Sequence, residues 1–208
     1  WPALAAAAVV ALLFYLGRNP RTPEAISSTM GDDAVGAMSE AAASAATAAG
    51  AAASHLGASV RRRLADGIEL MVPERGIESQ VVAFLDDPNR PVDRTTWFNF
   101  DRLTFETGAA RIRPESAEQL DNIAAILRAW PAARFKVGGY TDSTGDRAAN
   151  QRLSQARADA VRDALVAKGI AGDRLEAEGY GDQYPVGDNA TEAGREQNRR
   201  IALRVTAK

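Results

Sequence analysis

One stretch of the chain, residues 139–158, constrains its fold and its function more than any other. It reads Gly-Tyr-Thr-Asp-Ser-Thr-Gly-Asp-Arg-Ala-Ala-Asn-Gln-Arg-Leu-Ser-Gln-Ala-Arg-Ala and continues from an apolar run that is typical of a β-strand. The stretch places Asp142 in a turn and Arg157 in an amphipathic helix, fifteen residues later. A fixed anion together with a fixed cation suits a zwitterion, and the commonest zwitterion is a free amino acid head group.

From Trp97 onward, the sequence alternates between strand and helix patterns. Strands are predicted at 98–105 and 134–141, from 175 and from 201, and helices at 114–130 and at about 149–168. Pro114 suits the first turn of the earlier helix, and Gly169 suits the end of the later one. This alternation predicts an α/β layer in which helices cover one face of a mixed sheet.

Three separated motifs in this region resemble those of the OmpA-like C-terminal domain family. They read Gly-x-Thr-Asp-x-x-Gly at 139–145, Asn-x-x-Leu-Ser-x-x-Arg-Ala at 150–158 and Asn-Arg-Arg-Ile at 198–201. The resemblance extends over residues 96–208, about half of the chain. It implies an α+β sandwich with a mixed sheet, and noncovalent binding of peptidoglycan in the periplasm of Gram-negative bacteria.

The resemblance also implies which residues bind the ligand. The family's motif aspartate and arginine grip the ammonium and the carboxylate at the outer end of diaminopimelate, and they correspond to Asp142 and Arg157. A guanidinium can hold a carboxylate through two parallel hydrogen bonds. Helical side chains lean toward the helix N-terminus, so the head of Arg157 is expected to reach toward the turn that holds Asp142. Thr141, Asn150, Glu106 and Arg199 are further candidates for peptidoglycan contacts.

Each candidate also has a structural interpretation. An aspartate before Ser-Thr-Gly often caps a turn, and Asn150 either caps the helix or orients a ligand. Glu106 stands where the family's first motif usually has aspartate, which makes its carboxylate one methylene longer. Arg199 fits the family pattern and a salt bridge at the sheet edge equally well, and Thr141 is also expected in packing.

Composition excludes several classes of site. The chain has no cysteine, and its single histidine, His55, lies in an alanine-rich tract, so disulfides, thiolate zinc sites and a Ser-His-Asp triad are excluded from the folded part. The formal net charge is −2 and no large basic block is present, which argues against nucleic acid as a partner. No cofactor is expected. Paired carboxylates could in principle cut peptidoglycan, but no motif names an acid and a base, so we expect a binding protein and not an enzyme.

The segment before the domain divides into three parts. Residues 1–16 carry no charged side chain, and a spanning helix needs about 20 apolar residues. Because the chain starts at Trp1 and not at methionine, we expect residues upstream and predict a transmembrane helix at 1–17, with a signal-peptide remnant or a buried soluble helix as alternatives. Residues 18–63 are predicted to be a flexible, low-complexity, alanine-rich linker, and residues 64–95 a short strand and helix leading into the domain.

These parts predict a membrane-anchored protein whose C-terminal domain holds peptidoglycan in the periplasm, with the identity of the membrane left open. The alternative is a wall-anchoring subunit of a larger envelope machine, such as a stator or a secretion system. A stator helix should carry an ionisable residue for ion passage, and residues 1–16 have none. A homodimer and an envelope complex both stay open as assemblies.

Overall fold

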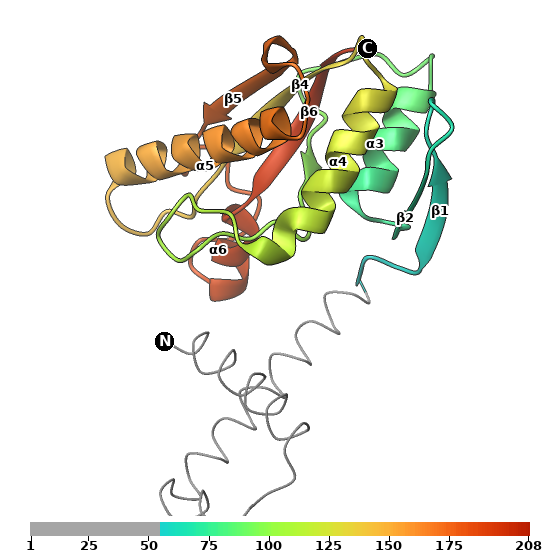
Figure 1. The fold of residues 1–208 in the computed structure, drawn as a ribbon. Coiled ribbons are helices and arrows are strands. Elements are labelled where there is room, and N and C mark those ends of the chain that lie inside the picture. The colour runs from blue at the N-terminus through green and yellow to red at the C-terminus, as the bar shows by residue number, and fades with distance from the viewer. Residues whose placement is uncertain (1–54) are drawn as a thin grey trace, which may run out of the picture. The chain divides into compact units, whose positions relative to one another are not determined.

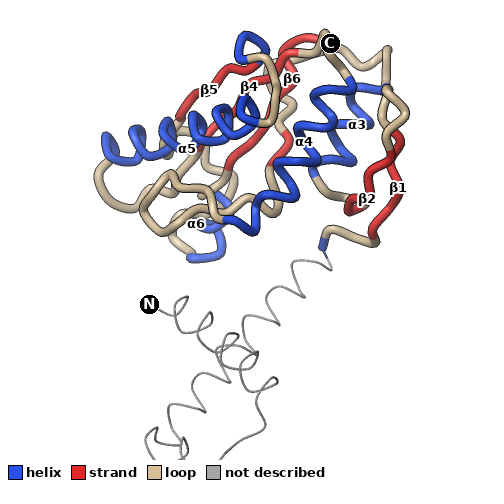
Figure 2. Tube along the Cα trace, in the orientation of Figure 1, coloured by secondary structure: helices blue, strands red, loops and turns tan. Residues whose placement is uncertain are grey.

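A four-stranded mixed sheet organises the part of the chain that this computed structural model describes, residues 55–208 (Figure 1 and Figure 2). Its strand order is β3 (Phe98–Asn99), β6 (Ile201–Ala207), β4 (Arg134–Gly139) and β5 (Leu175–Gly179). Strands β4 and β5 run parallel, whereas β6 is antiparallel to both β3 and β4. The C-terminal strand therefore lies inside the sheet.

Three helices cover one face of this sheet: α3 (Ile77–Asp86), α4 (Ala117–Ala129) and α5 (Arg147–Ala167) (Figure 1). The alternation along β4 explains the two faces, because Phe135 and Val137 are fully buried in the core and Lys136 is only half-buried. Burial of each large apolar side chain contributes about 1.5–3 kcal/mol. The predicted fold class, a mixed sheet with helices on one face, is confirmed.

Two glycines bring α5 unusually close to the sheet. A Cβ atom at Gly139 would lie 2.1 Å from the carbonyl oxygen of Ser154, and a Cβ at Gly179 would lie 2.3 Å from the backbone nitrogen of Gln155. Any side chain at either position would push the helix away. These glycines therefore set the distance between α5 and the sheet, and with it the position of Arg157.

Helix α5 begins and ends within two residues of the positions that its sequence predicts. Asp146 is the N-cap of α5, and its carboxylate accepts a hydrogen bond from the backbone nitrogen of Ala149 at 2.8 Å. Gly145 precedes the cap and Gly169 follows the helix, and both have positive φ angles, 84° and 89°. The helix starts two residues before the predicted Ala149 and ends one residue before the predicted Lys168.

The segment before the sheet forms a two-stranded hairpin, β1 (Ser59–Arg63) and β2 (Glu69–Pro73), followed by α3. The strand and helix expected between 64 and 95 are present as β2 and α3. Strand β1 falls inside the stretch for which the sequence predicts a linker, because three consecutive arginines conceal the alternation of a strand. The predicted transmembrane helix at 1–17 and most of the predicted linker lie outside the described residues.

Polar contacts join α3 to the loop after β3. Asp101 accepts a hydrogen bond from the backbone nitrogen of Ile77 at 2.8 Å. It thereby satisfies a donor at the first residue of α3, which has no partner within the helix. Glu78, a fully buried carboxylate on the same helix, pairs with Arg102. Burial raises the pKa of Glu78. Residues 77–86 thus belong to the same hydrophobic core as the sheet.

Elsewhere the elements differ from the expectation in detail. The strand predicted at 98–105 is reduced to β3 and an isolated bridge between Phe105 and Ile112, because the loop between them turns away to cap α3. A short helix, α6 (Glu192–Asn198), was not predicted, since it has no apolar periodicity. Two 3₁₀ turns, Pro114–Ser116 and Gly172–Arg174, complete the structure. Between residues 55 and 208, no helix is both long and apolar enough for a membrane span.

Candidate ligand-binding pocket

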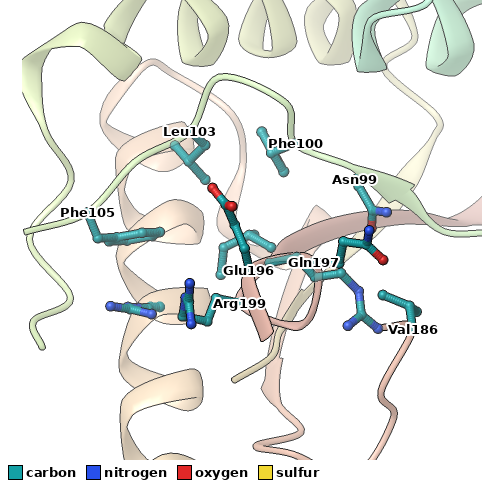
Figure 3. A pocket seen from close by; sticks show the side chains of 11 residues that line it. Asn99, Phe100, Leu103, Phe105, Val186, Glu196, Gln197 and Arg199 are labelled. Carbon is teal, nitrogen blue, oxygen red and sulfur yellow. The ribbon is translucent and has the colours of Figure 1, made fainter. Parts of the chain in front are cut away.

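A cavity of about 440 Å³ opens between the loop after β3, helix α5 and helix α6 (Figure 3). One part of its lining is apolar and aromatic and consists of Phe100, Leu103, Phe105, Val186 and Ile201. The other part is polar or charged and consists of Asn99, Arg157, Glu196, Gln197, Arg199 and Arg200. A small, mostly preformed cavity with a few convergent polar groups is typical of a site for a small ligand or a ligand end group.

Arg157 reaches the cavity from α5 and is held at one edge only. Its Nε donates a hydrogen bond to the carbonyl oxygen of Ala109 at 3.0 Å, and its guanidinium carbon lies 5.1 Å from the ring centroid of Phe105. In the described part of the chain, no hydrogen bond or ion pair involves its two terminal nitrogens. Burial, and then the nearby charge of Arg199, lower the pKa of Arg157. The guanidinium is thus oriented but keeps its outer donors available.

Arg199, which follows α6, is held much more completely. Its Nη1 donates to Asp142 at 2.8 Å and its Nη2 to Glu192 at 2.7 Å. The hydrogen bonds to these two carboxylates, Asp142 first, raise the pKa of Arg199. Arg199 lines the cavity (Figure 3). Its bond to Asp142 also joins the end of α6 to the turn after β4.

Asp142 both caps its turn and forms this ion pair. Its side chain accepts a hydrogen bond from the backbone nitrogen of Thr144 at 2.8 Å, and the residue is 9% exposed. Burial opposes the ionised form, but the hydrogen bonds from Arg199 and Thr144 outweigh it and hold the pKa of Asp142 below its ordinary value. Asp142 is not among the residues that line the cavity, and Arg199 connects the two.

The other predicted site residues surround this arrangement. The Asn150 side chain donates to the carbonyl oxygens of Asp142, at 3.3 Å, and of Thr144, at 2.9 Å, so it holds the turn. Thr141 is buried, and its backbone nitrogen donates to Gly181 at 2.9 Å. Glu106 is exposed, pairs with Arg111 at 3.7 Å and does not line the cavity.

Asp142 and Arg157 do not contact each other directly. The arginine that contacts Asp142 is Arg199, and the structure has no contact between Asp142 and Arg157 within salt-bridge distance. Arg157 is held instead by the loop after β3, through the carbonyl of Ala109 and the ring of Phe105.

Sequence reasoning missed Glu196 and Val186 as pocket residues. Both belong to the segment around α6, which Asn198 organises from a buried position. Its side-chain oxygen accepts from the backbone nitrogens of Val186, at 2.7 Å, and Gly187, at 2.9 Å. The available signal was proximity, because Glu196 lies two positions before Asn198, the first residue of the Asn-Arg-Arg motif, on the same short helix.

No group of three or more histidine or acidic side chains in residues 55–208 is arranged to hold a metal ion. The arrangement suits a different chemistry, the recognition of charged end groups. A half-buried guanidinium with open donors binds a carboxylate more strongly than an exposed one, because the environment around it is less polar than water.

Comparison with known proteins identifies the family of this chain. A model of the OmpA family matches residues 104–199. Outer-membrane lipoprotein YfiB of Pseudomonas aeruginosa is 32% identical over 143 residues, which cover 68% of this chain and 85% of that protein. The chain belongs to the OmpA family. Thus the family expected from the three motifs is confirmed.

Two further likenesses extend the comparison. Peptidoglycan-binding protein ArfA of Mycobacterium tuberculosis is 42% identical over 103 residues, or 50% of this chain and 32% of that protein. The periplasmic domain of Helicobacter pylori MotB has a TM-score of 0.51 at 20% identity, over 57% of this chain and 80% of that one, which shows a shared fold alone. The chain spans between 30% and 48% of the length of several other curated relatives.

Proposed function

We propose that this OmpA-family domain binds peptidoglycan noncovalently, by taking the diaminopimelate head group of the stem peptide into the pocket. The observation that carries the proposal is the state of Arg157. Its guanidinium is oriented by Ala109 and Phe105, is half-buried, and presents its terminal nitrogens without a protein partner among residues 55–208. A carboxylate that accepts two parallel hydrogen bonds is the natural complement of such a group.

The rest of the pocket suits the rest of that head group. The apolar side chains of Leu103 and Phe105 offer a surface for the methylene chain of diaminopimelate. The carboxylate of Asp142 keeps acceptor capacity beside its bonds to Arg199 and Thr144, so it can accept from the ligand's ammonium. We assign Thr141 and Asn150 to the support of this turn, and Glu106 to an outer contact with the ligand.

The relatives support the same proposal. ArfA is named as a peptidoglycan-binding protein, and its likeness to this chain covers the region that contains all three motifs. YfiB is named as an outer-membrane lipoprotein, which supports an envelope location with the domain in the periplasm. We further propose that a membrane helix at 1–17 and a linker at 18–63 tether this domain, so that binding joins a membrane to the wall.

Binding without turnover is part of the proposal. No acid and base pair for glycoside cleavage was identified in the sequence, and the single carboxylate in the pocket lining, Glu196, stands alone there. The full chain should leave no cleared zone in a zymogram on cell-wall material. A cleared zone would show an enzyme. Assembly into a larger envelope machine stays an alternative for the protein as a whole.

Calorimetric titration tests the binding proposal. The full 208-residue chain should bind meso-diaminopimelate and should bind lysine much more weakly, because lysine lacks the second carboxylate. A variant with glutamine at Arg162, an exposed arginine of the same helix that pairs with Asp159, serves as a control for loss of charge on α5. Equal binding of the two amino acids would contradict the head-group proposal.

A further inference from the structure

Glu196 supplies the only carboxylate among the residues that line the pocket. It projects from α6, and its carboxylate ends beside Leu103, above Arg199 (Figure 3). No motif of the sequence singled it out. Its position raises the question of what this negative charge does in a cavity that also contains arginines.

Two arginines of the lining, Arg199 and Arg200, already have partners. Arg199 is compensated by Asp142 and by Glu192. The guanidinium of Arg200 stacks at 3.8 Å from the ring centroid of Tyr140, and its Nη2 donates to the carbonyl oxygen of Tyr184 at 3.0 Å. These arginines therefore have partners within the folded domain.

Two charges of the lining are left over. In the part of the chain that the structure describes, neither a hydrogen bond nor an ion pair involves the side chain of Glu196, and none involves the terminal nitrogens of Arg157. The two residues come from different helices, α6 and α5, and do not pair with each other. One exposed carboxylate and one half-buried guanidinium thus line a single cavity of about 440 Å³ with open hydrogen-bonding positions, whereas Arg200 has a carbonyl oxygen and a ring as partners.

We infer that Glu196 is a specificity-determining residue that makes the pocket select a zwitterion over a simple dicarboxylate. The inference rests on the proposed function, in which Arg157 receives the carboxylate of the head group. Glu196 then faces the ammonium on the same carbon and repels a ligand that carries only negative charge. In the proposed function Asp142 also accepts from this ammonium, but Asp142 lies outside the lining and is paired with Arg199, so Glu196 is the anion of the lining itself.

The inference predicts a change in selectivity and not only a loss of affinity. Glu196→Gln keeps the shape of the side chain and removes its charge. We expect the variant to bind meso-diaminopimelate about tenfold more weakly, since a charge-assisted hydrogen bond becomes a neutral one. We expect it to bind pimelate, the same carbon chain without amines, at least as well as the unchanged protein does, because the repulsion is gone.

Calorimetry with the full chain tests this, with both ligands titrated into three proteins: the unchanged chain, Glu196→Gln and Glu176→Gln. Glu176 is an exposed glutamate on β5, outside the pocket, that pairs with Lys136 at 3.5 Å, so its variant controls for a lost surface charge. If the ratio of the two affinities were unchanged in Glu196→Gln, as an equal loss for both ligands would leave it, the inference would be overturned. Failure of the unchanged chain to bind meso-diaminopimelate would instead overturn the proposed function, and this inference with it.

Discussion

The two arginines of the pocket, Arg157 on α5 and Arg199 after α6, show how the same side chain can serve two purposes. Arg199 bonds to two carboxylates, which raise its pKa, and it joins α6 to the turn after β4. Arg157 bonds to one backbone carbonyl and packs on one ring, and burial lowers its pKa. The first arrangement satisfies the guanidinium and the second leaves it incomplete. A half-buried guanidinium with open donors gains the most from a ligand. Substitution of Arg157 should therefore lower ligand affinity, and substitution of Arg199 should lower folding stability.

The largest effect on ligand affinity is expected at Arg157. Arg157→Ala should weaken binding of diaminopimelate-containing peptidoglycan roughly ten- to a hundredfold, because a hydrogen bond to a charged group is worth about 1.5–3 kcal/mol. Arg157→Lys should restore only part of this, since lysine cannot form the two parallel bonds. The melting temperature should change little. Binding is measured by pull-down, and full retention by the alanine variant would rule out this role.

Substitution of Arg199, which bonds to two carboxylates, is expected to change stability instead. Arg199→Gln should lower the free energy of unfolding by about 1 kcal/mol, because the nearly buried Asp142 loses its partner, although solvent screens the pair on the side of Arg199. Urea denaturation measures the change, with Arg162→Gln as the matched exposed control. If Arg199→Gln left stability unchanged and abolished binding, the division of labour between the two arginines would be wrong.

The same contrast should appear as a dependence on pH. Hydrogen bonds from Arg199 hold the pKa of Asp142 and of Glu192 below their ordinary values, 3.8 and 4.5. A carboxylate with a lowered pKa stabilises the folded state above its unfolded pKa, and this contribution is lost as pH falls through the folded pKa. The stability difference between the unchanged chain and Arg199→Gln should therefore be full near neutral pH and shrink below about pH 4. A difference that grew in acid would contradict the assignment.

A smaller effect on stability than that of Arg199→Gln is expected at Asp142, the other member of the ion pair. Asp142→Asn should keep the hydrogen bond to Thr144 and the turn, since asparagine serves the same turns. It removes the charge that faces Arg199 and, in our proposal, the ligand's ammonium. Affinity for meso-diaminopimelate should fall, while thermal stability should fall less than in Arg199→Gln, because Arg199 keeps its bond to Glu192 and asparagine can still accept from it. Indistinguishable affinities in calorimetry would make Asp142 a structural residue and leave Arg157 alone in the head-group site.

The contrast between the arginines also shows which parts of the site the sequence predicts. The strand, turn and helix around Asp142 follow from local patterns, namely alternation, a cap residue and glycines, and these were predicted to within two residues at the helix start. The partner of Asp142, Arg199, lies 57 residues away and directly follows a helix without apolar periodicity. Such a pairing depends on how the sheet closes, with β6 placed beside β4, and no local pattern encodes it.

The same limit applies to the availability of a side chain. Arg157 and Arg199 were both named from motifs, but only the packing of Ala109 and Phe105 shows that one of them keeps open donors. Glu196 belongs to no motif, and its lack of a partner becomes visible only once its neighbours in the pocket are known. The sequence thus named two arginines that line the pocket, while the partners of each charged side chain required the structure.

The central claim is that the pocket recognises the carboxylate that diaminopimelate has and lysine lacks. Cosedimentation of the full chain with two purified peptidoglycans tests this most directly, one containing diaminopimelate and the other containing lysine at the same position. The account predicts that the chain sediments with the first and stays in the supernatant with the second, and that Arg157→Ala removes it from the first. Equal sedimentation with both walls would contradict the claim.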